Sequence, residues 1–364
     1  MTLENYIPII IIGAGISGLT IASKLEEKFL ILEARNRIGG RVWSRECARG
    51  SCTLDMGAAW IHGIKNNPLN HYLKYDELIP VSESNPWIHT EKTRILYEGM
   101  TDTQRQTLIY EWNCVAKELS TMDCKTVADA FFEYNKNNND TAMNLQSFIY
   151  LLEVWCGTSV SSMPPSFLRN IECDDSLFGD YAGSHCLFKK GTKSLITSIV
   201  TQSKQDLNQH ILFEQVVTDI LYDRDDGLVE VRTATGKTYL CEKLIVTTPP
   251  GPLQNINFAP PLSESRKCAL SKIKMGSYKK VQFEFDQVFW DTNATMILTN
   301  KKNEENIPYI LWNNYACLKG APILEAVCPA NVGWQLSGKT DENIADAVLV
   351  HMRNLYPWMP DPIS

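Results

Sequence analysis

A glycine-rich turn between two apolar runs is the part of the sequence that most clearly indicates a chemical function. Residues 7–12 form an apolar run that leads into Gly-Ala-Gly-Ile-Ser-Gly, where Gly13, Gly15 and Gly18 have the G-x-G-x-x-G spacing. In such a turn the first glycine bends tightly, the second lets backbone N–H groups approach a pyrophosphate, and the third lets a helix pack on the sheet. The positive end of that helix, which includes Ser17, then faces the phosphates. The sequence therefore predicts a dinucleotide-binding βαβ unit.

An acidic residue follows at the position that contacts the ribose of such a nucleotide. Glu33 ends the apolar run 29–33, twenty residues after Gly13. A carboxylate there accepts hydrogen bonds from both ribose hydroxyls and repels a 2′-phosphate. The pattern argues against NADP and leaves NAD and FAD open.

A second glycine turn, at Gly40, carries nearby arginines. Arg35, Arg37 and Arg41 follow the acidic residue directly. The guanidinium of Arg41 is planar and always charged, so it can neutralise a pyrophosphate. A solvated basic loop is the alternative interpretation. The position after a ribose-binding type of acid favours the phosphate contact.

Segments 33–42 and 54–63, the latter with the sequence Trp-Ile-His-Gly at its end, resemble the flavin-containing amine oxidases, and most closely the polyamine and spermine oxidases. The resemblance implies FAD as cofactor. The small residues after Met56 would let the backbone reach the flavin ring. We therefore expect flavin contacts from these residues: Arg35, Gly40, Arg41, Gly57, Ala58, Ala59 and Trp60. The family also has a position, matched here by Val217, whose backbone meets the adenine; a plain core valine is the alternative.

The segment 275–285, which continues to Phe289 and Trp290, is the second specific match. The family's lysine corresponds to Lys280 and holds a water near flavin N5, where a positive donor assists the reaction. Strand alternation turns Lys279 to the opposite face. Without the resemblance, both lysines would be interpreted as pointing to water. Tyr278 matches an aromatic residue that lines the substrate tunnel in some members and can contact an amine cation.

Two further residues are candidates for substrate binding. His62 follows the flavin-facing Trp60 and can hydrogen-bond an amine at the tunnel mouth; a structural or exposed histidine is the alternative. Glu153 matches an acidic residue in some members, although a glutamate on a helix surface is the preferred interpretation there.

Composition limits the possible partners. The chain has 364 residues and a formal net charge of −7, which argues against a nucleic-acid surface and is compatible with cationic ligands. Eleven cysteines without a C-x-x-C motif predict free thiols in a reducing compartment and give no support for a metal site. The N-terminus lacks the features of a signal peptide, and residues 9–12 are too short to span a bilayer, so we expect a cytoplasmic protein without a membrane segment.

The resemblance implies an α/β fold with two domains. The first is a Rossmann-like FAD-binding domain, doubly wound from βαβ units, over residues 1–84 and 183–270. The second is a substrate domain of a mixed sheet plus helices, over residues 85–182 and 271–364. Apolar spacing predicts helices at residues 108–119, 128–134, 145–155 and 194–199, and strands at 211–220, 229–233, 238–241 and 244–248, the last as a buried strand.

The implied activity is FAD-dependent oxidation of a polyamine. The amine becomes an imine that water hydrolyses to an aldehyde, and oxygen takes the electrons to give hydrogen peroxide. The partners are then an amine and oxygen; the sequence assigns no oligomeric state. Family members continue beyond the position of Ser364 with a flavin-binding segment, so we expect the C-terminal part of the FAD-binding domain to be missing from these residues, which would then bind FAD weakly. A non-catalytic flavoprotein remnant or binding module and a histone-lysine demethylase-like amine oxidase are the alternatives.

Overall fold

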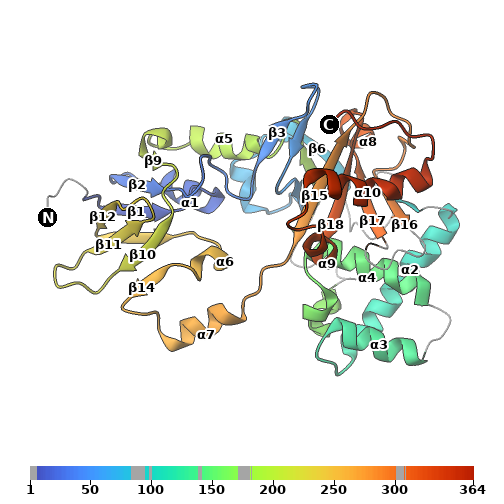
Figure 1. Ribbon diagram of the computed structural model, residues 1–364, viewed down its shortest axis with the longest axis horizontal. Helices are drawn as coiled ribbons and strands as arrows, with labels where there is room; N and C mark the ends of the chain where they lie inside the picture. Colours follow the sequence, from blue (N-terminus) through green and yellow to red (C-terminus); the bar gives the residue numbers. More distant parts are fainter. Residues whose placement is uncertain are drawn as a thin grey trace.

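The computed structural model describes residues 6–82, 95–97, 101–137, 142–170, 181, 183–300, 307 and 309–364. It shows a mixed α/β fold, in which the N-terminal strands and the C-terminal sheet lie at opposite ends of the long axis (Figure 1). The predicted boundary after residue 84 lies outside the described residues, and the predicted division into domains stays a prediction.

A four-stranded parallel sheet forms the N-terminal end. Its order is β13-β1-β2-β9. The strands are β1 (Ile9–Ile12), β2 (Phe29–Leu32), β9 (Ile211–Leu212) and β13 (Lys243–Val246). Side chains of β1 alternate between two apolar clusters, because successive strand residues point to opposite faces. Ile9 and Ile11 pack toward α1 (Ile16–Ala22) and α5 (Lys193–Thr201), and Ile10 and Ile12 pack on a second sheet.

That second sheet has the order β12-β11-β10-β14. Its strands are β10 (Val217–Leu221), β11 (Val229–Thr233), β12 (Thr238–Cys241) and β14 (Asn257–Ala259). Helix α6 (Pro250–Leu253) precedes β14, and helix α7 (Glu264–Lys272) follows it. The predicted hairpin of β11 and β12 is confirmed, with antiparallel pairing across the turn at Gly236.

Two strand predictions are wrong in part. The run 211–220 is not one strand, because Glu214 has a φ of +59° and the backbone N–H groups of Glu214 and Gln215 donate to Arg35 O and Glu33 O, which turns the chain from β9 into β10 in another sheet. The run 244–248 is not buried: β13 pairs only with β1 among the described strands, and Val246 is 36% exposed at that edge.

A five-stranded sheet, β15-β18-β17-β16-β7, forms the C-terminal end. Its strands are β7 (Ile95–Tyr97), β15 (Tyr278–Glu284), β16 (Met296–Asn300), β17 (Tyr309–Asn314) and β18 (Ile323–Pro329). The helices around it are α2 (Asp102–Thr121), α3 (Val127–Asn137), α4 (Ala142–Cys156), α8 (Tyr315–Lys319), α9 (Ala330–Gln335) and α10 (Asp341–Leu355). The predicted helices in α2, α3, α4 and α5 are confirmed.

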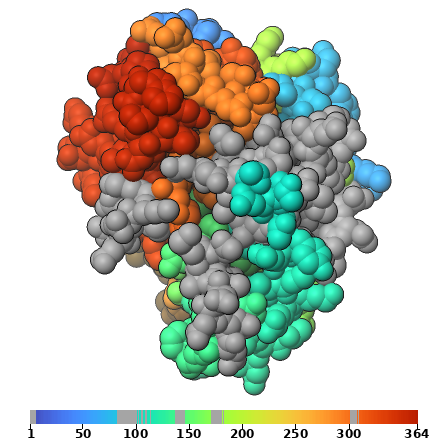
Figure 2. Space-filling model, turned by 90° about the vertical axis from the view of Figure 1, so that its right-hand side faces the viewer, coloured from blue at the N-terminus to red at the C-terminus, as the bar shows by residue number. Residues whose placement is uncertain are grey.

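The helices at this end cover both faces of the sheet. Helix α4 packs on β17 and β18, whereas α10 packs on β15, β16 and β17. Figure 2 shows this end from outside, with the red C-terminal residues above and the teal residues of α2 and α3 below. Caps fix where these helices begin: Thr101 and Gln104 form a capping box on α2, and Thr340 accepts from Asn343 N on α10.

Short elements connect the two ends. A hairpin of β3 (Ser44–Glu46) and β4 (Thr53–Asp55) and a small sheet of β5 (Trp60–Ile61), β8 (His185–Phe188) and β6 (Leu78–Ser82) lie there (Figure 1). The 3-10 helices in the described residues are η2 (Pro68–His71), η3 (Tyr75–Glu77), η4 (Val160–Ser162), η5 (Pro165–Asn170) and η6 (Leu207–His210).

Tyr150 fixes α4 on the sheet and generates a first prediction. Its buried hydroxyl donates to Val327 O at 2.6 Å and accepts from Leu311 N at 2.9 Å. Tyr150→Phe leaves both backbone groups without this partner, and each such group costs about 1–3 kcal/mol. We expect the free energy of unfolding in urea to fall by that order, while Tyr110→Phe, at a 70% exposed residue of α2, leaves it unchanged. Equal stability of the two variants would contradict this role.

Candidate functional site

One cavity brings together residues from both ends of the molecule. It has a volume of about 780 Å³, within the range of ligand-binding sites. Of the residues predicted from the sequence, the following line it: Arg35, Gly40, Arg41, Gly57, Ala58, Ala59, Trp60, His62, Tyr278 and Lys280. The lining also includes residues of α4, β8, β16, β17 and β18 that the sequence analysis did not assign. The roles of all these side chains stay predictions.

The three glycines of the first turn differ in the structural reason for a glycine at each position. Gly13 has a φ of +102°, a conformation that favours glycine. A Cβ on Gly18 would lie 2.0 Å from Gly13 O, so packing alone requires this glycine. A Cβ on Gly15 would meet nothing nearer than Gly40 Cα at 4.0 Å. Because the protein does not crowd Gly15, this position keeps backbone open for a phosphate, which fits a dinucleotide.

The two glycine turns lie side by side. Gly15 and Gly39 form an isolated parallel bridge, and a Cβ on Gly40 would lie 3.2 Å from Gly15 Cα. The arginine-rich loop is therefore held against the predicted phosphate-binding turn.

Glu33 is almost fully buried, at 7% exposed. Its Oε2 accepts from Ala14 N at 2.7 Å and its Oε1 from Arg35 N at 2.9 Å. The carboxylate thus orders both glycine turns. A carboxylate oxygen can accept a second hydrogen bond, so the predicted contact with a ribose hydroxyl fits this geometry.

The arginines divide into two kinds. Arg37 donates to Gly40 O at 2.9 Å and Ile38 O at 3.2 Å and lies over the ring of Trp43, and partial burial lowers the pKa of its guanidinium. Arg35 and Arg41 are exposed and line the cavity. Arg37 therefore holds the loop, whereas Arg35 and Arg41 place positive charge at the cavity, as their predicted contact with a pyrophosphate requires.

Lys280 is buried, with 8% of its side chain exposed. Its Nζ donates to Asp55 O at 2.8 Å and Gly57 O at 3.2 Å and lies 3.1 Å from Glu325 Oε2. These three contacts match the three N–H donors of an ammonium group. The alternative in which both lysines point to water is wrong, because Lys279 also has a partner, Leu336 O at 3.1 Å.

Glu325, the partner of Lys280, is a buried residue that the sequence analysis missed. It is fully buried in β18, and besides Lys280 its carboxylate accepts from Gln282 Nε2 at 2.5 Å, Asn313 Nδ2 at 2.8 Å and Tyr315 Oη at 3.2 Å. Strand register explains the first two contacts, since β15 and β17 pair with β18 at this residue. The sequence signal that could have indicated it is an acid inside the apolar run 323–328.

Asp55 forms a second buried charge centre beside Lys280. Its Oδ1 accepts from Ser44 Oγ at 2.6 Å, Thr192 N at 2.7 Å and Thr192 Oγ1 at 2.8 Å. Lys319 Nζ, with 3% of its side chain exposed, lies 3.8 Å from Asp55 Oδ2. The segment that ends at Trp60 is thereby fixed to α5, α8 and β15.

His62 lies against a second histidine, which the sequence analysis also missed. The Nδ1 atoms of His62 and His185 are 3.3 Å apart, and both rings line the cavity. Burial, with His185 as a smaller cause, lowers the pKa of His62 to about 4; burial also lowers the pKa of His185. Tyr278 also lines the cavity and is 49% exposed.

The predicted residues outside the described cavity lining are Gly13, Gly15, Ser17, Gly18, Glu33, Glu153 and Val217. Glu153 is only 8% exposed and accepts from Val160 N at 3.1 Å, so its interpretation as a surface glutamate is wrong. Burial raises the pKa of Glu153. Its helix does line the cavity, but with Leu151, Val154 and Trp155. The side chain of Val217 belongs to the core between the two N-terminal sheets.

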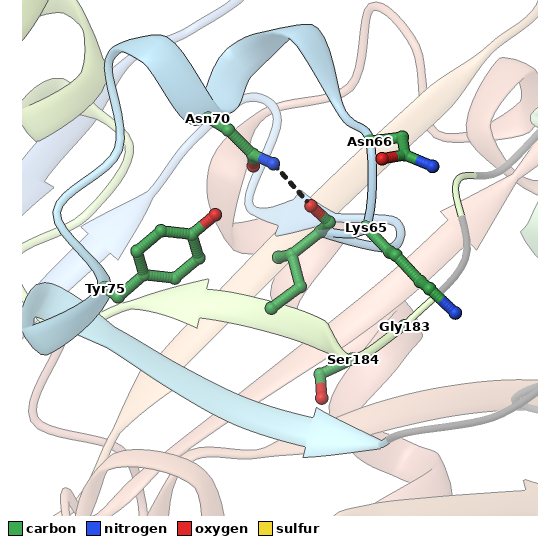
Figure 3. Close-up of a pocket in the computed structure, with 7 residues that line it drawn as sticks. Lys65, Asn66, Asn70, Tyr75, Gly183 and Ser184 are labelled. Carbon is green, nitrogen blue, oxygen red and sulfur yellow. Dashed lines mark hydrogen bonds between the residues drawn. The ribbon is translucent and has the colours of Figure 1, made fainter.

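A second cavity, of about 540 Å³, lies beside the segment that follows His62. Figure 3 shows Asn70, whose Nδ2 donates to Ile64 O at 2.7 Å, beside Tyr75, with Lys65 and Ser184 farther along the cavity. It contains none of the residues that the sequence predicts to be functional.

Two further properties concern the described residues alone. No group of three or more His, Cys, Asp or Glu side chains in them is arranged to hold a metal ion. None of the helices they form has the length and apolar character needed to cross a membrane.

Comparison with known proteins assigns the family. The model of the flavin-containing amine oxidoreductases matches residues 16–364, and the chain belongs to this family. Its cofactor is therefore FAD. The glycine turns, the buried acid and the exposed arginines described above fit the phosphates and ribose of that cofactor.

The chain is similar to proteins with different names. It is 26% identical to probable polyamine oxidase 4 of Arabidopsis thaliana, in an alignment of 399 residues that covers 97% of this chain and 72% of that protein. It is 29% identical to a corticosteroid-binding protein of Candida albicans, over 78% and 62% of the two chains. It is 27% identical to human lysine-specific histone demethylase 2, over 79% of this chain and 35% of the demethylase.

The glycine geometry predicts a difference between two substitutions. Gly15→Ala places a methyl group where the protein leaves space, so we expect the fold to persist while FAD binding weakens by about 1.5–3 kcal/mol, the worth of one hydrogen bond to a charged group. Gly18→Ala clashes with Gly13 O, so we expect loss of stability as well. Fluorescence titration with FAD and urea unfolding measure the two effects. Unchanged FAD affinity of the Gly15 variant contradicts the proposed phosphate contact.

Because Lys280 and Glu325 form a buried ion pair, we predict that removing one of the two charges costs more stability than removing both. Glu325→Gln leaves the Lys280 ammonium buried without its counterion, and removal of one member of a buried pair costs about 3–5 kcal/mol. The double variant Lys280→Met/Glu325→Gln removes both charges, and we expect it to recover part of that loss in urea unfolding. Glu264→Gln, in an exposed pair with Lys267, is the control and should cost less than about 1 kcal/mol. A double variant less stable than Glu325→Gln would refute the pairing.

Proposed function

We propose that the protein is an FAD-dependent amine oxidase that acts on a polyamine and releases hydrogen peroxide. The observation that carries the proposal is the single cavity in which the arginine-rich glycine turns meet Lys280 and a group of aromatic side chains. The similarity to polyamine oxidases supports the substrate class.

The parallel sheet with its glycine turn is, in this proposal, a Rossmann-like FAD-binding domain over residues 1–84 and 183–270. The C-terminal sheet and its helices, over residues 85–182 and 271–364, form the substrate domain. The proposed FAD contacts are Gly13, Gly15, Ser17, Gly18, Glu33, Arg35, Gly40, Arg41, Gly57, Ala58, Ala59, Trp60 and the backbone of Val217.

Bound FAD supplies the acceptor for a hydride from the α-carbon of the amine. The chain's own residues bind the cofactor and supply the charges around it. Arg35 and Arg41 neutralise the pyrophosphate, and Glu33 accepts from the ribose. Lys280 holds a proton on Nζ beside the backbone of Gly57 and supplies positive charge where negative charge develops.

The aromatic side chains bind the amine. Trp60, Trp155 and Tyr278 line the cavity, and their faces attract a cationic nitrogen while their apolar surface excludes water from the alkyl chain. The amine loses a hydride from its α-carbon and a proton from its nitrogen and becomes an imine, which water hydrolyses to an aldehyde and a shorter amine. Oxygen finally takes up the two electrons of the hydride and two protons, the equivalent of that hydride and proton, to form hydrogen peroxide.

The similarity to histone demethylases favours a second candidate, oxidation of a methylated lysine in a peptide. The two functions separate in one experiment. The FAD-loaded protein is mixed without oxygen with spermine, spermidine, their acetylated forms or a dimethyl-lysine peptide, and bleaching of the flavin absorbance is followed. Bleaching by the peptide alone favours the demethylase function, and bleaching by none of them favours a non-catalytic flavoprotein.

The proposed role of Lys280 gives a prediction for this function, with Lys279 as the control. We expect Lys280→Met, made together with Glu325→Gln so that no unpaired charge is buried, to slow flavin reduction or reoxidation by about 10²-fold or more while FAD remains bound. Lys279→Met, on the neighbouring position, should change either rate little. Rapid mixing of the FAD-loaded variants measures both rates. Similar effects of the two lysine substitutions would contradict the proposed catalytic role of Lys280.

A further inference from the structure

Two cysteines face each other across the hairpin of β3 and β4, and both are free thiols in the structure. The antiparallel register pairs Glu46 with Thr53, so the next pair along is Cys47 with Cys52, and Cys47 N donates to Cys52 O at 2.9 Å. Directly opposite residues of such a pair have Cα atoms about 4.5–5.5 Å apart and side chains on the same face. A disulfide spans Cα atoms about 4.4–6.8 Å apart. Strand pairing therefore holds the two cysteines at a separation that a disulfide can bridge.

Both side chains belong to one apolar cluster beside the large cavity. Cys47 and Cys52 are 4% and 8% exposed and pack with the side chain of Tyr315. Met56 packs against the same cluster and also lines the cavity. On the other side of the pair, residues 48–51 of the turn are all exposed. The two thiols therefore lie between the cavity, where Met56 adjoins them, and a turn that is open to solvent.

The hydrogen bonds of the two sulfurs differ. Cys47 Sγ accepts from Cys52 N at 3.3 Å and lies 3.5 Å from Ser51 Oγ. Cys52 Sγ donates to Thr53 O at 3.5 Å. A donor directed at a sulfur stabilises its thiolate, whereas a sulfur that donates is held as the thiol. Burial is the largest cause that raises the pKa of Cys52, to about 11. Cys47 is therefore the member of the pair that reacts first with an oxidant.

The turn between the two cysteines is tied to the strand that carries Lys280. Ala48 N and Arg49 N donate to the carboxylate of Glu284, at 2.8 Å and 3.3 Å, at the end of β15. Glu284 is only 2% exposed, so these bonds are part of the interior. A bond between the two sulfurs would close a ring that contains Ala48 and Arg49. It would thereby restrain the backbone that holds Glu284.

We propose that Cys47 and Cys52 are a dithiol that a peroxide converts to a disulfide, with Cys47 reacting first. Cys47 Sγ attacks one oxygen of hydrogen peroxide: an S–O bond forms, the O–O bond breaks, and the thiol proton leaves with the other oxygen as water. Cys52 Sγ then attacks the sulfenic sulfur: the S–S bond forms, the S–O bond breaks, and a second water carries away the proton of Cys52. The two thiols lose two electrons, and the peroxide gains them. This inference goes beyond the proposed amine oxidation, which would release the peroxide in the adjoining cavity.

Tryptic peptides report the bond directly, because Arg49 lies between the two cysteines. Cleavage after Arg45, Arg49 and Lys65 separates residues 46–49 from residues 50–65. The FAD-loaded protein is treated with hydrogen peroxide, unfolded in N-ethylmaleimide to block the remaining thiols, and digested without reductant. We expect both peptides to lose their maleimide adducts and to form one linked species that dithiothreitol separates. If both peptides keep their maleimide, or are oxidised without a link between them, the proposal is overturned.

Two other buried cysteines are matched controls in the same digest. Cys186 lies opposite Ile61 and Pro80, and Cys241 lies opposite Val229, so neither has a cysteine opposite it in the described sheets. Burial raises the pKa of each of these thiols to about 11. We expect both to keep their maleimide adducts under conditions that link the hairpin pair. Equal loss of adducts at the controls and at the pair means unspecific oxidation and overturns the proposal.

Single substitutions test the order of the two steps. In Cys52→Ser the sulfenic acid on Cys47 has no second thiol to react with, so we expect dimedone, which traps sulfenic acids, to label Cys47. In Cys47→Ser we expect no dimedone label on Cys52. Both substitutions nearly preserve side-chain size, and urea unfolding checks that the variants remain folded. Labelling of Cys52 as strongly as of Cys47 overturns the assigned order.

Failure of the proposed function remains distinguishable from failure of this inference, because the peroxide is added rather than generated. If no amine reduces the flavin but the linked peptides form, only the proposed function falls. If amines reduce the flavin but peroxide leaves the two peptides unlinked, only this inference falls.

Discussion

The geometry of the cavity depends on two buried ion pairs that meet at the segment between Asp55 and Gly57. Lys280 pairs with Glu325, and Lys319 lies 3.8 Å from Asp55. Four charges in the interior carry a large desolvation cost, which their mutual attraction and the surrounding hydrogen bonds offset only when every partner is in place. The cost is therefore a constraint on geometry: β15, β18, α8 and the Asp55–Gly57 segment hold one relative arrangement.

This constraint changes how Lys280 can act. All three of its N–H donors have protein partners, so a water near the flavin receives a hydrogen bond only if the ammonium gives up one of them. The contact with Gly57 O, at 3.2 Å, is the longest of the three. Because Gly57 also lines the cavity, exchange of that bond would couple the position of the lysine to the backbone that the proposed flavin contacts.

What the sequence predicted were features encoded over short distances. The glycine spacing, Glu33 after β2 and the apolar spacing of the helices depend on neighbouring residues alone. Glu325, Thr192 and His185 became evident only in the structure, because their partners lie 45, 137 and 123 residues away. Glu153 shows the same limit, since helix periodicity does not indicate that η4 covers that face. The break in strand 211–220 depends on a turn at Glu214 that strand propensity does not encode.

The described lining of the cavity combines charged and aromatic side chains. It includes Arg35, Arg37 and Arg41 together with Trp155 and Tyr278. The ammonium of Lys280 pairs with Glu325, 3.1 Å away, so its charge is balanced within the protein. In the proposed function, an amine bound by aromatic and apolar surface is held best when the reacting nitrogen has lost its proton, because an uncharged nitrogen costs less to desolvate. That is the form required for hydride loss, because the lone pair on nitrogen stabilises the carbon as the hydride leaves.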